Sequence, residues 1–108
     1  MGGEGRERRF GRLTSTTDEG LLSYGSYLRI PELIELQQLR SDPPVHDELL
    51  FIIVHQAYEL WFRQLLFEVE TIRDRLFDGD TERARHYLVR VKAIERVLIE
   101  QIDVLRSM

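Results

Sequence analysis

The chain has 108 residues, of which 43% are hydrophobic and 31% are charged, and these values fit one small globular domain at most. The net charge of −4 argues against a general nucleic-acid-binding protein, and the absence of cysteine excludes a disulfide scaffold or a thiolate metal site. No apolar span approaches the roughly 20 residues that cross a bilayer, and the N-terminus lacks the apolar core of a secretory signal. We therefore expect a cytoplasmic protein that contacts neither membrane nor nucleic acid.

The first 30 residues divide into two segments of different composition. Residues 1–20 are rich in Gly, Arg, Ser and Thr, with only Phe10 and Leu13 as large apolar residues, which is typical of a disordered tail. Residues 21–30 (LLSYGSYLRI) are aromatic and apolar but have no clean helical or strand period, so they predict an irregular arm that docks on another surface. Such an arm packs either on its own core or on a neighbouring subunit, where it closes that subunit's pocket.

A short helix and a break are predicted next. Pro31 suits the first helical position, and Leu33, Ile34, Leu36 and Leu39 give an apolar stripe to a helix over residues 31–40. The sequence Ser41-Asp42-Pro43-Pro44 then ends that helix and precedes another start.

The next predicted element is a long helix over residues 45–77. Every residue from 49 to 54 is hydrophobic, so this part is apolar on all sides and needs cover on all sides. Towards its end the helix becomes amphipathic. One side carries Leu65, Val69, Ile72 and Leu76, whereas Glu68, Glu70, Arg73 and Asp74 are predicted to lie largely outside.

A tight link and a last helix complete the prediction. In Asp78-Gly79-Asp80, Gly79 can supply a left-handed helix cap, and Asp80 or Thr81 can cap a helix that runs from about residue 82 towards the end. Two antiparallel helices joined in this way bury one stripe each, so we expect additional polypeptide to cover the remaining apolar surface. The stripe of the last helix consists of Tyr87, Val91, Ile94, Leu98, Ile102 and Leu105.

His55 is the strongest candidate for chemistry, because it is a polar group in an apolar wall with Phe51 one turn before it. Such a histidine can exchange a proton or hydrogen-bond a flat ligand. The plainer interpretation, which the pattern alone favours, is a structural histidine whose ring is satisfied by a backbone carbonyl.

A metal site in a helical bundle is a weaker hypothesis. His46, Asp47 and Glu48, with His55 and Glu59, could suggest one, but the Glu-x-x-His spacing of di-metal bundles is absent. Asp47 and Glu48 are more simply first-turn acids that suit the helix dipole. We therefore predict no metal ligated by side chains of this chain.

These residues carry a family resemblance. Residues 46–74, HDELLFIIVHQAYELWFRQLLFEVETIRD, closely resemble the signature helix of tryptophan 2,3-dioxygenases, and residues 23–37, SYGSYLRIPELIELQ, resemble the segment that precedes it. The resemblance implies an all-helical homotetramer that uses haem b. It also implies insertion of both atoms of O₂ across the indole C2–C3 bond of L-tryptophan, giving N-formyl-L-kynurenine in the first step of the kynurenine pathway of tryptophan catabolism.

The resemblance also assigns roles to individual positions. His55 matches the catalytic histidine on the distal side, which hydrogen-bonds the indole N–H, and Phe51 matches the phenylalanine that packs against substrate above the haem. Tyr24, Tyr27 and Leu28 match substrate-site residues of an arm that reaches into a neighbouring subunit.

By the same resemblance, this region is only the N-terminal part of the family's chain. The proximal histidine that ligates the haem iron and the arginine that holds the substrate carboxylate match no residue here. The expected fold is all-α, with an antiparallel hairpin of long helices preceded by a short helix and an irregular arm, as part of a larger helical haem-binding fold. Residues 21–108 would be an incomplete segment of that domain, inactive in isolation. The alternative is a non-catalytic helical module that self-associates.

Overall fold

The computed structural model describes residues 22–108, so the tail predicted over residues 1–20 lies outside the described residues. The chain forms two compact units, Met1–Gln38 and Leu39–Met108, and each is described by itself.

The described part of the first unit contains two helical turns, α2 (Tyr24–Tyr27) and α3 (Ile30–Leu33). The arm predicted to be irregular thus includes a turn of helix, which a capping box stabilises: the Ser23 hydroxyl accepts from the Ser26 N–H, and the Ser26 hydroxyl accepts from the Ser23 N–H. Arg29, with φ of 56°, separates the two turns in the left-handed region.

The helix predicted over residues 31–40 is much shorter than expected. It ends at Leu33, and the side-chain amides of Gln37 and Gln38 donate to the carbonyl oxygens of Leu33 and Glu35, each at 3.0 Å. Such local bonds compete with the N–H donors that would continue a helix, and they explain why the apolar stripe did not extend it.

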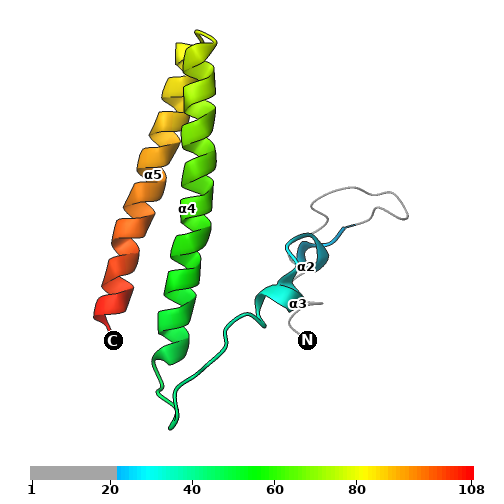
Figure 1. Ribbon diagram of the computed structural model, residues 1–108, viewed down its shortest axis with the longest axis vertical. Coiled ribbons are helices and arrows are strands. Elements are labelled where there is room, and N and C mark those ends of the chain that lie inside the picture. Colours follow the sequence, from blue (N-terminus) through cyan, green and yellow to red (C-terminus); the bar gives the residue numbers. More distant parts are fainter. Residues whose placement is uncertain (1–21) are drawn as a thin grey trace. The chain divides into compact units, whose positions relative to one another are not determined.

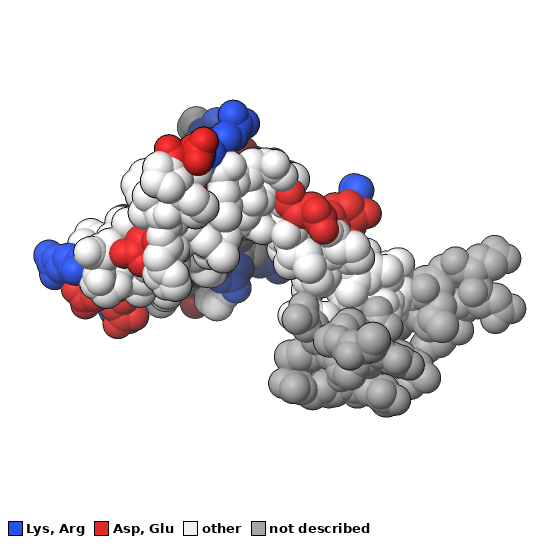
Figure 2. Space-filling view, turned by 90° about the horizontal axis from the view of Figure 1, so that it is seen from below, with Lys and Arg blue, Asp and Glu red and all other residues white. Residues whose placement is uncertain are grey.

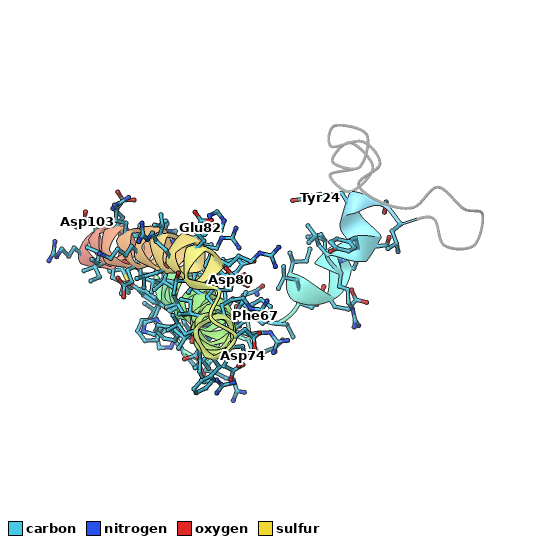
Figure 3. All side chains as sticks on the ribbon, turned by 90° about the horizontal axis from the view of Figure 1, so that it is seen from above. Tyr24, Phe67, Asp74, Asp80, Glu82 and Asp103 are labelled. Atoms are coloured by element: carbon cyan, nitrogen blue, oxygen red, sulfur yellow. The ribbon has the colours of Figure 1, made fainter. Side chains whose placement is uncertain are left out.

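The second unit is the predicted hairpin, formed by α4 (Glu48–Phe77) and α5 (Thr81–Arg106), which lie side by side along their length (Figure 1). Gly79 adopts φ of 79°, and the Asp80 carboxylate caps α5 by accepting from the Arg83 N–H at 3.1 Å, as the sequence predicted. Asp80 is labelled at this turn in Figure 3, with Asp103 towards the far end of α5. The antiparallel all-α hairpin is therefore confirmed.

The two helices meet along a seam of three- and four-residue steps. In α5 the prediction was nearly right: the less exposed positions include every predicted residue except Ile102, whose place is taken by Gln101. In α4 the placement of Glu68 outside was wrong, because its side chain is only 1% exposed. It is held there by hydrogen bonds from Gln64 and Arg90. The buried apolar residues in the described part of the chain are Val54, Ala84 and Ile94.

Because α4 turns a partly polar edge towards α5, its most apolar sides stay uncovered. Large side chains on those sides are 44–64% exposed; they include Leu60, Phe62, Leu66 and Phe67. On the face seen in Figure 2, residues other than Lys, Arg, Asp and Glu make up most of the described surface, and the charged residues gather in a few clusters. No helix among residues 22–108 has both the length and the apolar character needed to span a bilayer.

Candidate functional site

Phe51 and His55 lie together on α4, one turn apart. Their ring centroids are 4.2 Å apart with the planes tilted by 34°, and His55 Nδ1 lies 2.8 Å from the Phe51 carbonyl oxygen. Because a carbonyl oxygen only accepts, Nδ1 carries the proton in this bond. In the neutral ring, Nε2 then has a lone pair that can accept a hydrogen bond.

The backbone bond is the one that the plain structural interpretation of His55 predicted. The surroundings are different, however, because His55 is exposed and Phe51 is 49% exposed. The two rings therefore form a solvent-exposed aromatic surface, on which His55 Nε2 can accept a hydrogen bond.

Aromatic rings continue this surface along α4. The Tyr58 ring meets His55 edge-on at 6.4 Å and stacks with Phe62 at 6.0 Å. The Tyr58 hydroxyl donates to the Leu98 carbonyl oxygen of α5 at 2.9 Å. This bond ties the His55 side of α4 to its partner helix, so the ring next to His55 has a fixed orientation.

The arm residues Tyr24, Tyr27 and Leu28 come together in a different way. Tyr24 and Tyr27 are the ends of α2 and Leu28 is its C-cap, so their spacing of three and four residues puts them on one face of a helical turn. Tyr27 is 54% exposed and Leu28 is 42% exposed, which leaves that face open to another surface.

Glu48 is the residue that the sequence interpretation missed. Its carboxylate accepts from the Arg40 N–H at 2.7 Å, from the Ser41 N–H at 3.1 Å and from the Ser41 hydroxyl at 2.6 Å. The hydroxyl bond, followed by the two backbone bonds, lowers the pKa of Glu48 below its ordinary value of 4.5. An acidic residue in the first turn of a helix is usually explained by its favourable interaction with the helix dipole. No pattern in the sequence predicts that such a residue accepts hydrogen bonds from residues seven and eight positions earlier.

No metal centre is found in the part of the chain that the structure describes, where no three His, Cys, Asp or Glu residues gather. His86 lies exposed on α5 with its ring edge-on to Tyr87 at 5.4 Å, and His46 lies exposed in the turn before α4. The three histidines of the sequence thus point to no shared site.

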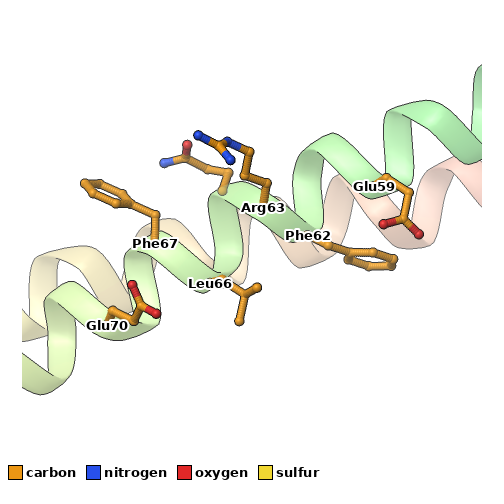
Figure 4. A pocket seen from close by; sticks show the side chains of 7 residues that line it. Glu59, Phe62, Arg63, Leu66, Phe67 and Glu70 are labelled. Carbon is orange, nitrogen blue, oxygen red and sulfur yellow. The ribbon is translucent and has the colours of Figure 1, made fainter.

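Two open grooves lie along α4, and neither contains Phe51 or His55. The larger, of about 720 Å³, is lined by one helix and presents Phe62, Leu66 and Phe67 between charged side chains (Figure 4). The smaller is lined by Ala57, Leu60, Trp61 and Gln64. Because each groove is bounded by a single helix, we assign both grooves to the uncovered apolar surface of α4. The candidate site is therefore placed at Phe51 and His55.

Comparison with known proteins gives this geometry a context. The family model for tryptophan 2,3-dioxygenase matches residues 12–108. The tryptophan 2,3-dioxygenase of a Nocardioides species is 59% identical over 91 residues, which cover 81% of this chain and 34% of that protein. The one from Herpetosiphon aurantiacus is 48% identical over 87 residues, covering 81% and 34%, and the one from Dictyostelium discoideum is 41% identical over 93 residues, covering 79% and 23%.

The match has a clear extent. It covers most of this chain, whereas the chain spans about a third or less of the length of these relatives. The family model nevertheless matches 97 of the 108 residues, from 12 to 108, and a match of this extent establishes family membership. The chain belongs to the tryptophan 2,3-dioxygenase family.

Proposed function

We propose that this chain forms the N-terminal, substrate-facing part of an enzyme that converts L-tryptophan and O₂ to N-formyl-L-kynurenine, the entry reaction of the kynurenine pathway. The observation that carries the proposal is the 2.8 Å contact between His55 Nδ1 and the Phe51 carbonyl oxygen. The Phe51 carbonyl holds the Nδ1 proton, so Nε2 can accept the indole N–H of a bound tryptophan. A cytoplasmic location and a homotetrameric assembly remain predictions from the sequence.

Phe51 would pack against the substrate, and His55 would orient its indole ring. The Phe51 ring offers a flat apolar surface against which an aromatic substrate stacks and excludes water. The His55 hydrogen bond fixes how the indole is turned, which matters because the reacting C2–C3 bond must meet oxygen in one geometry. His55 would act on the substrate and not as an iron ligand.

Haem b is the cofactor that the family resemblance implies, and when bound it would supply the activation of O₂. The residues present fit one wall of a haem pocket and not a complete site. A haem iron needs an axial ligand, and the proximal histidine that the family resemblance implies matches none of the three histidines of this chain, which are His46, His55 and His86. The axial ligand would therefore come from polypeptide other than these 108 residues. We expect the isolated chain to be inactive.

Tyr24, Tyr27 and Leu28 would complete the site from a neighbouring subunit. Tyr27 and Leu28 are exposed, and their side of α2 suits docking on an aromatic surface such as the one around Phe51. Exchange of such arms would make the homo-oligomer necessary for the substrate site.

The test uses a haem-loaded, full-length enzyme that begins with this segment. His55→Ala should reduce kcat/KM for L-tryptophan up to about ten-fold, because one hydrogen bond contributes about 0.5–1.5 kcal/mol and about 1.4 kcal/mol corresponds to a factor of ten, while the haem content stays unchanged. His86→Ala is the matched control and should leave both quantities as they are. Loss of haem from the His55→Ala enzyme, with the fold intact, would contradict the assigned role.

A non-catalytic module that self-associates is the second candidate, and the exposed apolar sides of α4 favour it. Haem titration of the 108-residue chain, followed by its Soret absorption beside a sizing column, separates the two. Oligomers that ignore haem and tryptophan would support the module. Turnover of tryptophan by the haem-supplemented chain would overturn the expectation that it is inactive alone.

A further inference from the structure

The carboxylate of Glu48 closes a loop in front of α4. One oxygen accepts from the Arg40 N–H, and the other accepts from both the N–H and the hydroxyl of Ser41. The Ser41 hydroxyl oxygen in turn accepts from the Val45 N–H at 3.0 Å. Two side chains thus fix the backbone of residues 40–45 against the first turn of α4.

This arrangement differs from helix capping. The N-cap of α4 is Asp47, whose side chain makes no capping bond. The Glu48 carboxylate accepts hydrogen bonds from the loop residues Arg40 and Ser41. Several hydrogen bonds to one carboxylate favour its charged form, in agreement with the lowered pKa of Glu48. Glu48 therefore holds the loop, and its side-chain hydrogen bonds do not cap its own helix.

The position of Glu48 connects the loop to the candidate site. Glu48, Phe51 and His55 are spaced by three and four residues, so they lie on one face of α4. With a rise of about 1.5 Å per residue, Glu48 lies only about 10 Å along the axis from His55. The loop is therefore anchored at one end of the strip that carries Phe51 and His55.

We propose that Glu48 is a positioning residue for the substrate site, which it serves by holding the backbone of residues 40–45 as the end wall beside Phe51 and His55. The proposal rests on the proposed function. It adds a residue that touches neither substrate nor cofactor and acts through the loop. Release of the loop would enlarge the site, so substrate affinity would fall more than the rate of the bound complex.

The experiment compares two carboxylates in the haem-loaded, full-length enzyme that begins with this segment. Glu48→Gln keeps the side-chain shape but turns an N–H₂ group towards the donors of the loop. Glu82→Gln is the control, because Glu82 is the first-turn acid of α5 and so has the same relation to a helix dipole. Ser41→Ala, which keeps the backbone donors to Glu48, is a milder second variant.

We expect Glu48→Gln to raise KM for L-tryptophan about ten-fold, with kcat changed less than about three-fold. Ser41→Ala should raise KM by less, and Glu82→Gln should leave both constants unchanged. Hydrogen exchange of at least one of the Arg40 and Ser41 amides should become faster in Glu48→Gln and not in Glu82→Gln, since an N–H₂ group replaces one of the two accepting oxygens.

Two kinetic outcomes would overturn the role of Glu48. One is a wild-type KM in an active Glu48→Gln enzyme, and the other is the same change in kcat, KM and haem content in all three variants. Unchanged exchange of the Arg40 and Ser41 amides would overturn it whatever the kinetics. A wild-type enzyme that leaves tryptophan unchanged would contradict the proposed function and the positioning role with it, and the exchange pattern would still report whether Glu48 holds the loop.

Discussion

Arg90 of α5 reaches across the hairpin to Glu68 of α4: its Nη1 atom lies 3.3 Å from a carboxylate oxygen whose side chain is 1% exposed. The same oxygen accepts from the Gln64 side-chain amide at 2.6 Å. Arg90 is itself 49% exposed and its guanidinium lies 5.6 Å from the centre of the Tyr87 ring. A buried charge in the seam is thus paired with a cation at the rim, a contact that requires one register of the two helices.

Arg90→Met should destabilise the folded protein by about 2–3 kcal/mol, because it leaves the buried Glu68 charge with Gln64 alone. The half-exposed position of Arg90 keeps this below the loss for a fully buried pair. Urea unfolding of the full-length protein measures the change. The control is Arg83→Met, whose exposed ion pair with Asp80 at 3.6 Å should count for less than about 0.5 kcal/mol. Equal losses in the two variants would show that burial of Glu68 does not matter.

Tyr58→Phe tests the hydrogen bond that joins the aromatic row of α4 to α5. The ring contacts with His55 and Phe62 are kept, while the bond to the Leu98 carbonyl oxygen is lost. We expect a loss of about 1 kcal/mol in the free energy of unfolding. Tyr87→Phe is the control, since the Tyr87 hydroxyl has no hydrogen bond among the described residues, and it should change stability little. A Tyr58→Phe protein as stable as wild type would mean that water replaces the bond without cost.

Gly79→Ala tests the turn between α4 and α5. Gly79 has φ of 79° and a Cβ atom there would meet nothing within 4 Å, so any loss comes from backbone conformation and not from a clash. We expect a loss of about 1 kcal/mol for Ala, and a smaller loss for Gly79→Asn because Asn tolerates the left-handed region. Thermal unfolding of both variants measures this. If Ala and Asn behave alike, left-handed strain is not the cause.

The hairpin could be predicted from sequence because local rules and the helical period agree. Gly79 supplied the turn, Asp80 the cap, and residues such as Tyr87 and Ile94 the period of α5. The prediction of a helix over residues 31–40 failed, because there the apolar period and the local hydrogen bonding favour different structures. The leucines of residues 31–40 suggested a helix, but glutamine side chains took the carbonyl oxygens that the helix would need.

The partners of polar residues could not be predicted in the same way. Glu68 looked like a solvent-facing acid because nothing in its neighbours reveals that Arg90, 22 residues later, lies opposite it. For the same reason the sequence predicts for Glu48 only the role of a first-turn acid that suits the helix dipole. Phe51 and His55 were paired correctly, since one turn of helix fixes their contact. Their roles towards substrate are proposals, because they depend on residues beyond that turn.

Lowering the pH should release the loop that Glu48 holds. Hydrogen bonds from the Ser41 hydroxyl and from the Arg40 and Ser41 amides lower the pKa of Glu48 below 4.5 in the folded state. The stabilisation is therefore fully present above the ordinary value and is lost as the pH falls through the lowered folded value. Arg40 is the charged side chain that contributes to the lowered pKa of Glu48, and its positive charge favours the ionised carboxylate.

The amide signals of Arg40 and Ser41, followed by NMR from pH 7 to pH 3, measure this release. Both should be constant down to about pH 5 and should move together below 4.5, the ordinary pKa of the Glu48 carboxyl. In Glu48→Gln the two signals should lack that transition, and in Glu82→Gln they should keep it. A transition with its midpoint above 4.5 would contradict the direction of the shift, because it would mean that the loop prefers the protonated carboxyl.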